Sequence, residues 1–169
     1  MRSDNPLYAQ RREELLRTHF TEAMVVPAGH KTLHPDEALH HPDFYHNGRV
    51  WPNDNREIAK VLQGSGYHGL AMDTYKRIAR GVDETGMYAE NFRGIPEGID
   101  PGNRIVYIVT PDGQKCRRIQ VPQPGQTWTL GAYMQSQRMI ELGNEGRIPQ
   151  RAIVSSKRHL EDELLERVS

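Results

Sequence analysis

Residues 104–121 have the sequence RIVYIVTPDGQKCRRIQV, and this stretch carries the clearest β-strand signal in the chain. Residues 104–109 are almost all β-branched or aromatic, which favours an extended strand. Pro111–Gly113 supplies turn chemistry, because proline fixes φ, aspartate bonds nearby backbone and glycine tolerates positive φ. Residues 114–121 then place polar side chains on one face of a second strand. We therefore predict an antiparallel β-hairpin with Gly113 in its turn.

Helical patterns lie on both sides of this hairpin in the sequence. The first helix begins after Asn5, a good N-cap, and Pro6, which suits the first helical position. Its apolar stripe includes Leu15, Phe20 and Met24 at helical spacing. We expect helices over residues 7–24, 56–63, 67–80, 131–142 and 156–168, with Gly64 and Gly81 ending the second and third.

These patterns together predict an α+β fold that is mostly helical, with several helices around a small antiparallel hairpin or sheet. The chain suits a single domain over residues 1–169, from which the helical ends 1–14 and 156–169 project. Residues 30–55 form a long connection, in which a short helix is expected to start at Asp36 and to stop at Pro42. Residues 151–154 are expected to form a third short strand.

The composition is polar and electrically balanced. Lysine and arginine total 22, aspartate and glutamate total 22, and the formal net charge is zero. This balance argues against a general polyanion binder, although it does not exclude a basic patch on one face of the protein.

No apolar run approaches the ~18 residues of a membrane helix, and the first residues lack a signal-peptide core. With Cys116 as the single cysteine, we expect a cytoplasmic protein made in a reducing compartment, with no membrane contact.

Five of the eight histidines fall within 17 residues of one another. They are His30, His34, His40, His41 and His46. Imidazoles beside carboxylates are the usual ligands of zinc and other divalent metals. However, no H-E-x-x-H sequence is present and Pro35 interrupts any helix that would join the first two. We expect these side chains to cap turns and bond backbone, and a metal-dependent hydrolase site on this loop is one alternative.

Residues 56–80 offer a second alternative. A helix over 54–63, which contains Ile58, Ala59 and Leu62, is followed by a glycine-rich turn and then by a second helix over 67–80. This pattern resembles a DNA-binding helix-turn-helix, and the segment carries five basic and two acidic side chains. The resemblance implies phosphate contacts from the second helix, made by Lys76, Arg77 and Arg80. The competing interpretation is a helical hairpin that only packs.

The last predicted helix combines an apolar line with charged flanks. Its apolar side chains are Leu160, Leu164, Leu165 and Val168. A helix of about twelve residues is marginal alone, so this line must dock on the chain's own core or on another subunit. We predict that part of its burial comes from another chain, which makes these four residues partner-binding. Glu161, Asp162 and Glu163 are expected on a solvated face.

The sequence supplies no recognisable nucleophile motif or acid–base pair, so we assign no catalytic residue and no cofactor. Arginine outnumbers lysine by 17 to 5, and arginine is enriched at protein interfaces where lysine is depleted. We therefore predict a non-enzymatic structural or interaction protein that is a subunit of a larger assembly, with protein partners in an oligomer or hetero-assembly. A component of a bacteriophage virion or tail is one example that suits the size and composition.

Overall fold

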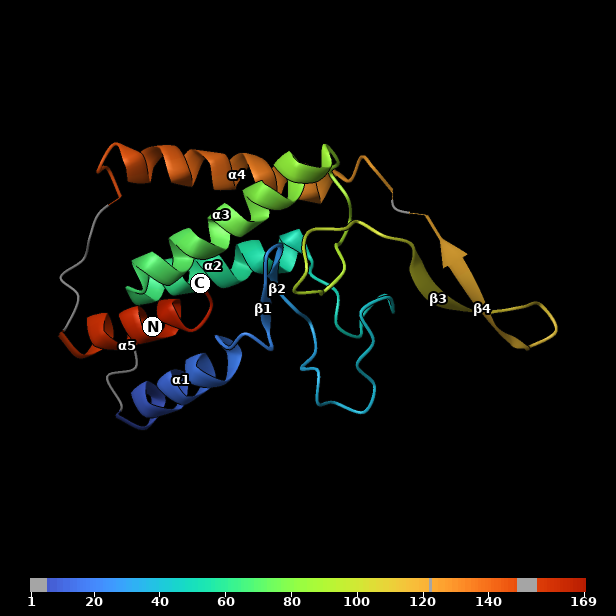
Figure 1. The fold of residues 1–169 in the computed structure, drawn as a ribbon, viewed down its shortest axis with the longest axis horizontal. Coiled ribbons are helices and arrows are strands. Elements are labelled where there is room, and N and C mark those ends of the chain that lie inside the picture. Colours follow the sequence, from blue (N-terminus) through green and yellow to red (C-terminus); the bar gives the residue numbers. More distant parts are fainter. Residues whose placement is uncertain (1–5, 122, 149–154) are drawn as a thin grey trace.

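The computed structural model describes residues 6–121, 123–148 and 155–169, which form an α+β fold dominated by helices (Figure 1). The helices of this part are α1 (Pro6–His19), α2 (Pro52–Ser65), α3 (His68–Thr85), α4 (Thr127–Asn144) and α5 (Ser155–Glu166). The strands are β1 (Val25–Val26), β2 (Gly29–His30), β3 (Arg104–Val109) and β4 (Lys115–Gln120). The mostly helical α+β class predicted from the sequence is therefore confirmed.

Helix α3 lies at the centre of the helical part and contacts α2, α4, α5 and strand β2. Its side chains Leu70, Tyr75 and Ile78 are fully buried, and α2 adds Ala59 and Leu62 to the same cluster. Burying each large apolar side chain is worth about 1.5–3 kcal/mol. The core is therefore built by helices packed on several sides of α3.

The end of α3 differs from the sequence prediction. Gly81 lies inside the helix, where a Cβ would approach the buried Phe92 ring to 3.0 Å. The helix continues to Thr85 and is capped by Gly86, whose φ is +65° and whose N–H donates to the carbonyl of Val82. The prediction of a stop at Gly81 is wrong, because that glycine makes room for a neighbouring ring instead of ending the helix.

Helix α1 is shorter than predicted, because it ends at His19. The N–H groups of Met24 and Val25 both donate to the carbonyl of Thr21, at 2.9 and 2.8 Å, so the chain turns there into β1. Phe20 and Met24 are buried, but they reach the core from this turn. Leu15, predicted in the same stripe, is exposed. The helical spacing of residues 15–24 thus spans two different elements.

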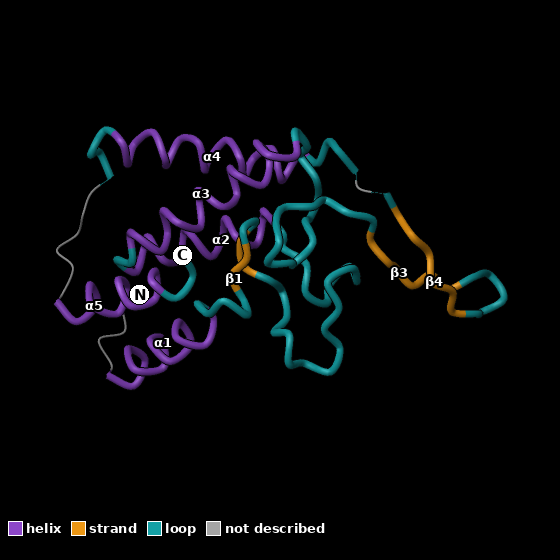
Figure 2. The backbone as a smooth tube through the Cα atoms, viewed as in Figure 1, coloured by secondary structure: helices purple, strands orange, loops and turns teal. Residues whose placement is uncertain are grey.

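The two small sheets are separate antiparallel pairs (Figure 2). β1 pairs with β2, and β3 pairs with β4 in a register that sets Arg104 opposite Gln120. At the turn of the β3–β4 hairpin, the Gly113 N–H donates to the carbonyl of Thr110 at 2.8 Å, and φ of Gly113 is +83°. The hairpin predicted from residues 104–121 is confirmed, including the backbone conformation that favours glycine in its turn.

Two long connections, residues 31–51 and 86–103, pack on each other beside the helices. Val50 and Phe92 exchange backbone hydrogen bonds of 2.9 and 2.8 Å, and both side chains are buried in a second apolar cluster. The short helix predicted from Asp36 is wrong, since the structure has turns there. The strand predicted at 151–154 lies outside the described residues.

Candidate interaction surface

The β3–β4 hairpin extends away from the helices (Figure 1). One of its faces exposes Val109 and Ile119 and is named the apolar face here, although Lys115 and Arg117 lie on it as well. The register pairs Ile105 with Ile119 and Val109 with Lys115, which places these four side chains on the same face. Val109 is 67% exposed, Ile119 is 70% exposed, and Val121, just after the strand, is 72% exposed. A two-stranded hairpin is at best marginally stable alone and normally rests an apolar face on another surface.

The base of the hairpin is tied to the loop that precedes α2. The Ile105 N–H donates to the Asp43 carbonyl at 2.7 Å, and the Tyr45 N–H donates to the Ile105 carbonyl at 3.4 Å. The Arg117 guanidinium lies 5.9 Å from the centroid of the Phe44 ring, within range of a cation–π contact. These contacts fix the direction in which the hairpin leaves the body of the molecule.

The hairpin carries uncompensated positive charge. Lys115, Arg117 and Arg118 are exposed, and within the described chain none of the three pairs with a carboxylate. The only acid between residues 104 and 121 is Asp112, whose carboxylate accepts a hydrogen bond from the Thr110 hydroxyl. That bond lowers the pKa of Asp112. The carboxylate is thus bonded within the turn and does not pair with the basic side chains of the hairpin.

An ion-pair group borders the base of the same face. The Arg93 guanidinium contacts Asp43 at 2.6 Å and Asp100 at 3.3 Å. These three side chains, together with Ile105 and Ile119, line an open pocket of about 320 Å³. The apolar face of the hairpin therefore continues into a shallow depression with polar walls.

A buried polar cluster, missed by the sequence analysis, ties the two long connections together. The Arg49 side chain is buried, and it donates to Asn91 Oδ1 and to the carbonyl of Pro101, the latter at 2.5 Å. The buried carboxylate of Glu90 accepts a hydrogen bond of 2.8 Å from the Tyr45 hydroxyl. Buried charges are tolerated only with such partners. The cluster therefore holds the loops from which the hairpin emerges.

The structure does not bring the five candidate histidines together. His30 is buried in the helical core, where its ring stacks on His19. His34 and His41 each accept a hydrogen bond at Nδ1 from a backbone N–H two residues later, at 3.2 and 3.1 Å. His40 packs its ring against Gly48, and His46 stacks on Trp51. Nowhere in the described chain do three or more His, Cys, Asp or Glu side chains form a group that could hold a metal ion.

The basic residues of the helix-turn-helix alternative lie on the central helix α3. Arg77 pairs with Asp73 at 2.7 Å and donates to the carbonyls of Val26 and Val168, at 3.1 and 2.7 Å. Arg80 pairs with Glu84 at 2.5 Å, and Lys76 is exposed. A recognition helix must enter a groove, whereas α3 is covered by α2, α4 and α5. Arg77 is thus engaged in contacts within the fold.

Helix α5 packs on its own chain. Leu160, Leu164 and Val168 are buried in the main core cluster, and Leu165 packs against it half-buried. Their burial needs no second chain. Glu161, expected on a solvated face, is instead buried, and it accepts a 2.9 Å hydrogen bond from the Leu70 N–H in the first turn of α3. That N–H has no partner inside the helix, so the carboxylate caps α3 and is favoured by the helix dipole.

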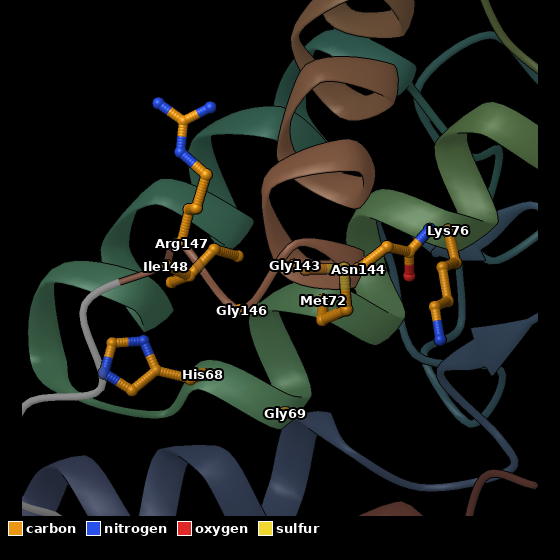
Figure 3. Close-up of a pocket in the computed structure, with 9 residues that line it drawn as sticks. All are labelled: His68, Gly69, Met72, Lys76, Gly143, Asn144, Gly146, Arg147 and Ile148. Carbon is orange, nitrogen blue, oxygen red and sulfur yellow. The ribbon is translucent and has the colours of Figure 1, made fainter.

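An open pocket of about 660 Å³ lies between the start of α3 and the end of α4 (Figure 3). The His68 ring, Lys76 and Arg147 are its titratable members, and Arg147 is already paired with Glu145 at 2.9 Å. In Figure 3 the His68 ring and the charged ends of Lys76 and Arg147 point in different directions. The pocket therefore does not bring its polar groups to one point, as a ligand site requires.

Comparisons with protein-family models, with curated proteins and with solved structures found no match to this chain. Among residues 6–121, 123–148 and 155–169, no helix combines the length and the apolar character needed to cross a membrane. Function is therefore inferred from the chain's own residues and geometry. Of the surfaces described above, the apolar face of the hairpin is the one that combines exposed aliphatic side chains with cations that have no carboxylate partner in the described chain.

Proposed function

We propose that this chain is a non-enzymatic interaction protein that acts as a subunit of a larger assembly. The observation that supports this function is the uncovered face of the β3–β4 hairpin, on which Val109 and Ile119 are exposed. Covering such a side chain completely is worth about 1.5–3 kcal/mol. A partner laid on this face would therefore stabilise a sheet that is marginal without one.

The other two candidate functions draw less support from the contacts. The engaged Arg77 does not favour the DNA-binding alternative, and the separated histidines do not favour a metal-dependent hydrolase. The virion or tail of a bacteriophage, given above as an example of the assembly, stays a prediction.

The mass of the purified protein in solution tests this proposal. By light scattering we expect multiples of 19.4 kDa, or a stoichiometric complex with a partner from the source cells. Ile119→Asp should reduce the mass to that of one chain, because a charge would then sit in the interface. Val61→Asp is the matched control, since Val61 is 68% exposed on α2, away from the hairpin. A single-chain mass for the unaltered protein, with no partner, would contradict the proposal.

A further inference from the structure

We propose that the apolar face of the β3–β4 hairpin binds the acidic loop 36–39 of a second copy of this chain. The inference rests on the proposed function, because it names the occupant of the same surface. The two surfaces are exposed patches of opposite charge, and each combines charged with aliphatic side chains.

The first patch is the hairpin face. Its exposed aliphatic side chains are Val109, next to the turn, and Ile119, near the base. Lys115 lies opposite Val109, and Arg117 lies between the two ends, on the same face by the alternation of β4. Neither cation has a carboxylate partner within the described chain. An occupant that matches this face must therefore combine an aliphatic side chain with carboxylates.

The second patch is the loop of residues 36–39, with the sequence Asp-Glu-Ala-Leu. All four residues are exposed; Leu39 is 73% exposed and the Asp36 side chain is 92% exposed. Two turns shape the loop, since Glu37 N–H donates to the His34 carbonyl at 3.0 Å and His40 N–H donates to the Glu37 carbonyl at 2.8 Å. The loop thus offers an exposed leucine that follows two carboxylates on a backbone that is already turned.

The chemistry of the two patches is complementary. Leu39 can cover Ile119 while Asp36 and Glu37 meet Lys115 and Arg117, so apolar burial and charge pairing occur in one contact. Such complementarity mainly sets specificity and association rate, whereas apolar burial supplies most of the affinity. The formal net charge of zero means that copies of the chain do not repel one another overall.

A second copy explains this face better than a nucleic acid does. Phosphate binding uses several cations and would leave Val109 and Ile119 uncovered. The two patches are different surfaces of the same chain, so two copies can pair reciprocally around a two-fold axis or join head to tail. The reciprocal form closes a dimer and the head-to-tail form continues into a ring or filament, and both agree with a subunit of an assembly.

Charge reversal tests the contact by light scattering. One variant carries Lys115→Glu with Arg117→Glu, and the other carries Asp36→Lys with Glu37→Lys. Each alone should fall to 19.4 kDa, because like charges then face each other. Mixed in equal amounts, the two variants should recover the mass of the unaltered assembly, since every contact again joins opposite charges. Arg118→Glu, on the opposite face of β4, is the control and should leave the mass unchanged.

The outcomes separate this inference from the proposed function. If Ile119→Asp disrupts the assembly but the two variants assemble normally, or do not recover on mixing, the self-contact is wrong while the assembly function stands. If the unaltered protein is a single chain and shifts a DNA duplex through Lys115 and Arg117, the occupant is a nucleic acid and this inference is overturned. Circular dichroism of each variant checks that the helices remain folded.

Discussion

Helix α3 and the β3–β4 hairpin show opposite relations between local structure and burial. In α3, side chains from Leu70 to Val82 are buried at helical spacing because other elements surround the helix. In β4, no side chain is fully buried, although the strand pairing is complete. A turn and matched strands therefore give the hairpin its local shape, but only packing against other elements makes a core.

The polar groups of the two regions differ in the same way. Around α3, the carboxylate of Glu161 caps an N–H group and Arg77 is held by Asp73 and two backbone carbonyls. On the hairpin, Lys115 and Arg117 pair with no carboxylate in the described chain. Glu161 and Arg77 are therefore held by contacts within the fold, whereas the two cations of the hairpin are exposed.

The largest expected effect comes from truncating a buried side chain of α5. Leu164→Ala should lower the free energy of unfolding by about 2–5 kcal/mol, because it removes a fully buried side chain and leaves a cavity. Val61→Ala, at an exposed position on α2, should change it by less than about 0.5 kcal/mol. Urea unfolding followed by circular dichroism measures both. An effect of Leu164→Ala as small as that of the control would show that α5 is not part of the core.

The sequence predicted elements better than boundaries. The hairpin was predictable because Pro111–Gly113 specifies its turn by local chemistry. The end of α3 was not, because Gly81 is explained by Phe92, a ring distant in the sequence that no local pattern reveals. In the same way, Phe20 and Met24 satisfy helical spacing while lying after α1, so spacing alone did not locate its end.

The second-largest expected effect is a loss of folding stability at low pH. His30 is buried with its ring stacked on His19 at 4.8 Å between centroids, and its Nε2 lies 3.2 Å from the Thr74 hydroxyl. Burial lowers the pKa of both histidines, and the charges of His19 and Arg77 lower the pKa of His30 further. The folded state therefore binds fewer protons than the unfolded chain, and stability must fall as the pH drops below the unfolded value of about 6.5.

Urea unfolding from pH 8 to pH 5 measures this dependence. The free energy of unfolding should be steady down to about pH 7 and then fall, by at most about 1.4 kcal/mol per pH unit for each histidine. His30→Phe keeps an aromatic ring beside Phe20 and should flatten the slope. His159→Phe, at an exposed histidine of α5, is the control and should leave it unchanged. Equal slopes for His30→Phe and the unaltered protein would refute the role of His30.

The candidate surface was only partly predictable. The residues of the hairpin face were visible in the sequence, but their exposure was not, since Val109 and Ile119 resemble core residues in a linear pattern. Arg49 and Glu90 were missed because their partners, Asn91 and Tyr45, lie more than 40 positions away. The predicted partner-binding role of Leu164 and its neighbours rested on an apolar line that the structure places in the chain's own core.

A third effect should be confined to the hairpin. Gly113→Val puts a β-branched residue at φ +83°, which costs about 1–3 kcal/mol. Amide exchange in β3 and β4 should accelerate, while exchange in α3 should not, because the hairpin stands apart from the helices. Gly98→Val, at a glycine with open space and ordinary φ, is the control. Equal acceleration in α3 would mean that the two regions unfold as one unit.

The smallest effect is expected from making the hairpin face polar. Val109→Ser together with Ile119→Ser should change the free energy of unfolding of the helical part by less than about 0.5 kcal/mol, since both side chains are exposed. The measurement is urea unfolding of the dilute, dissociated protein, because an assembled protein would also lose partner contacts. A loss above about 1 kcal/mol would show that these residues stabilise the chain itself. Their exposure would then no longer support a surface reserved for a partner, and the distinction between the helical core and the hairpin would fail.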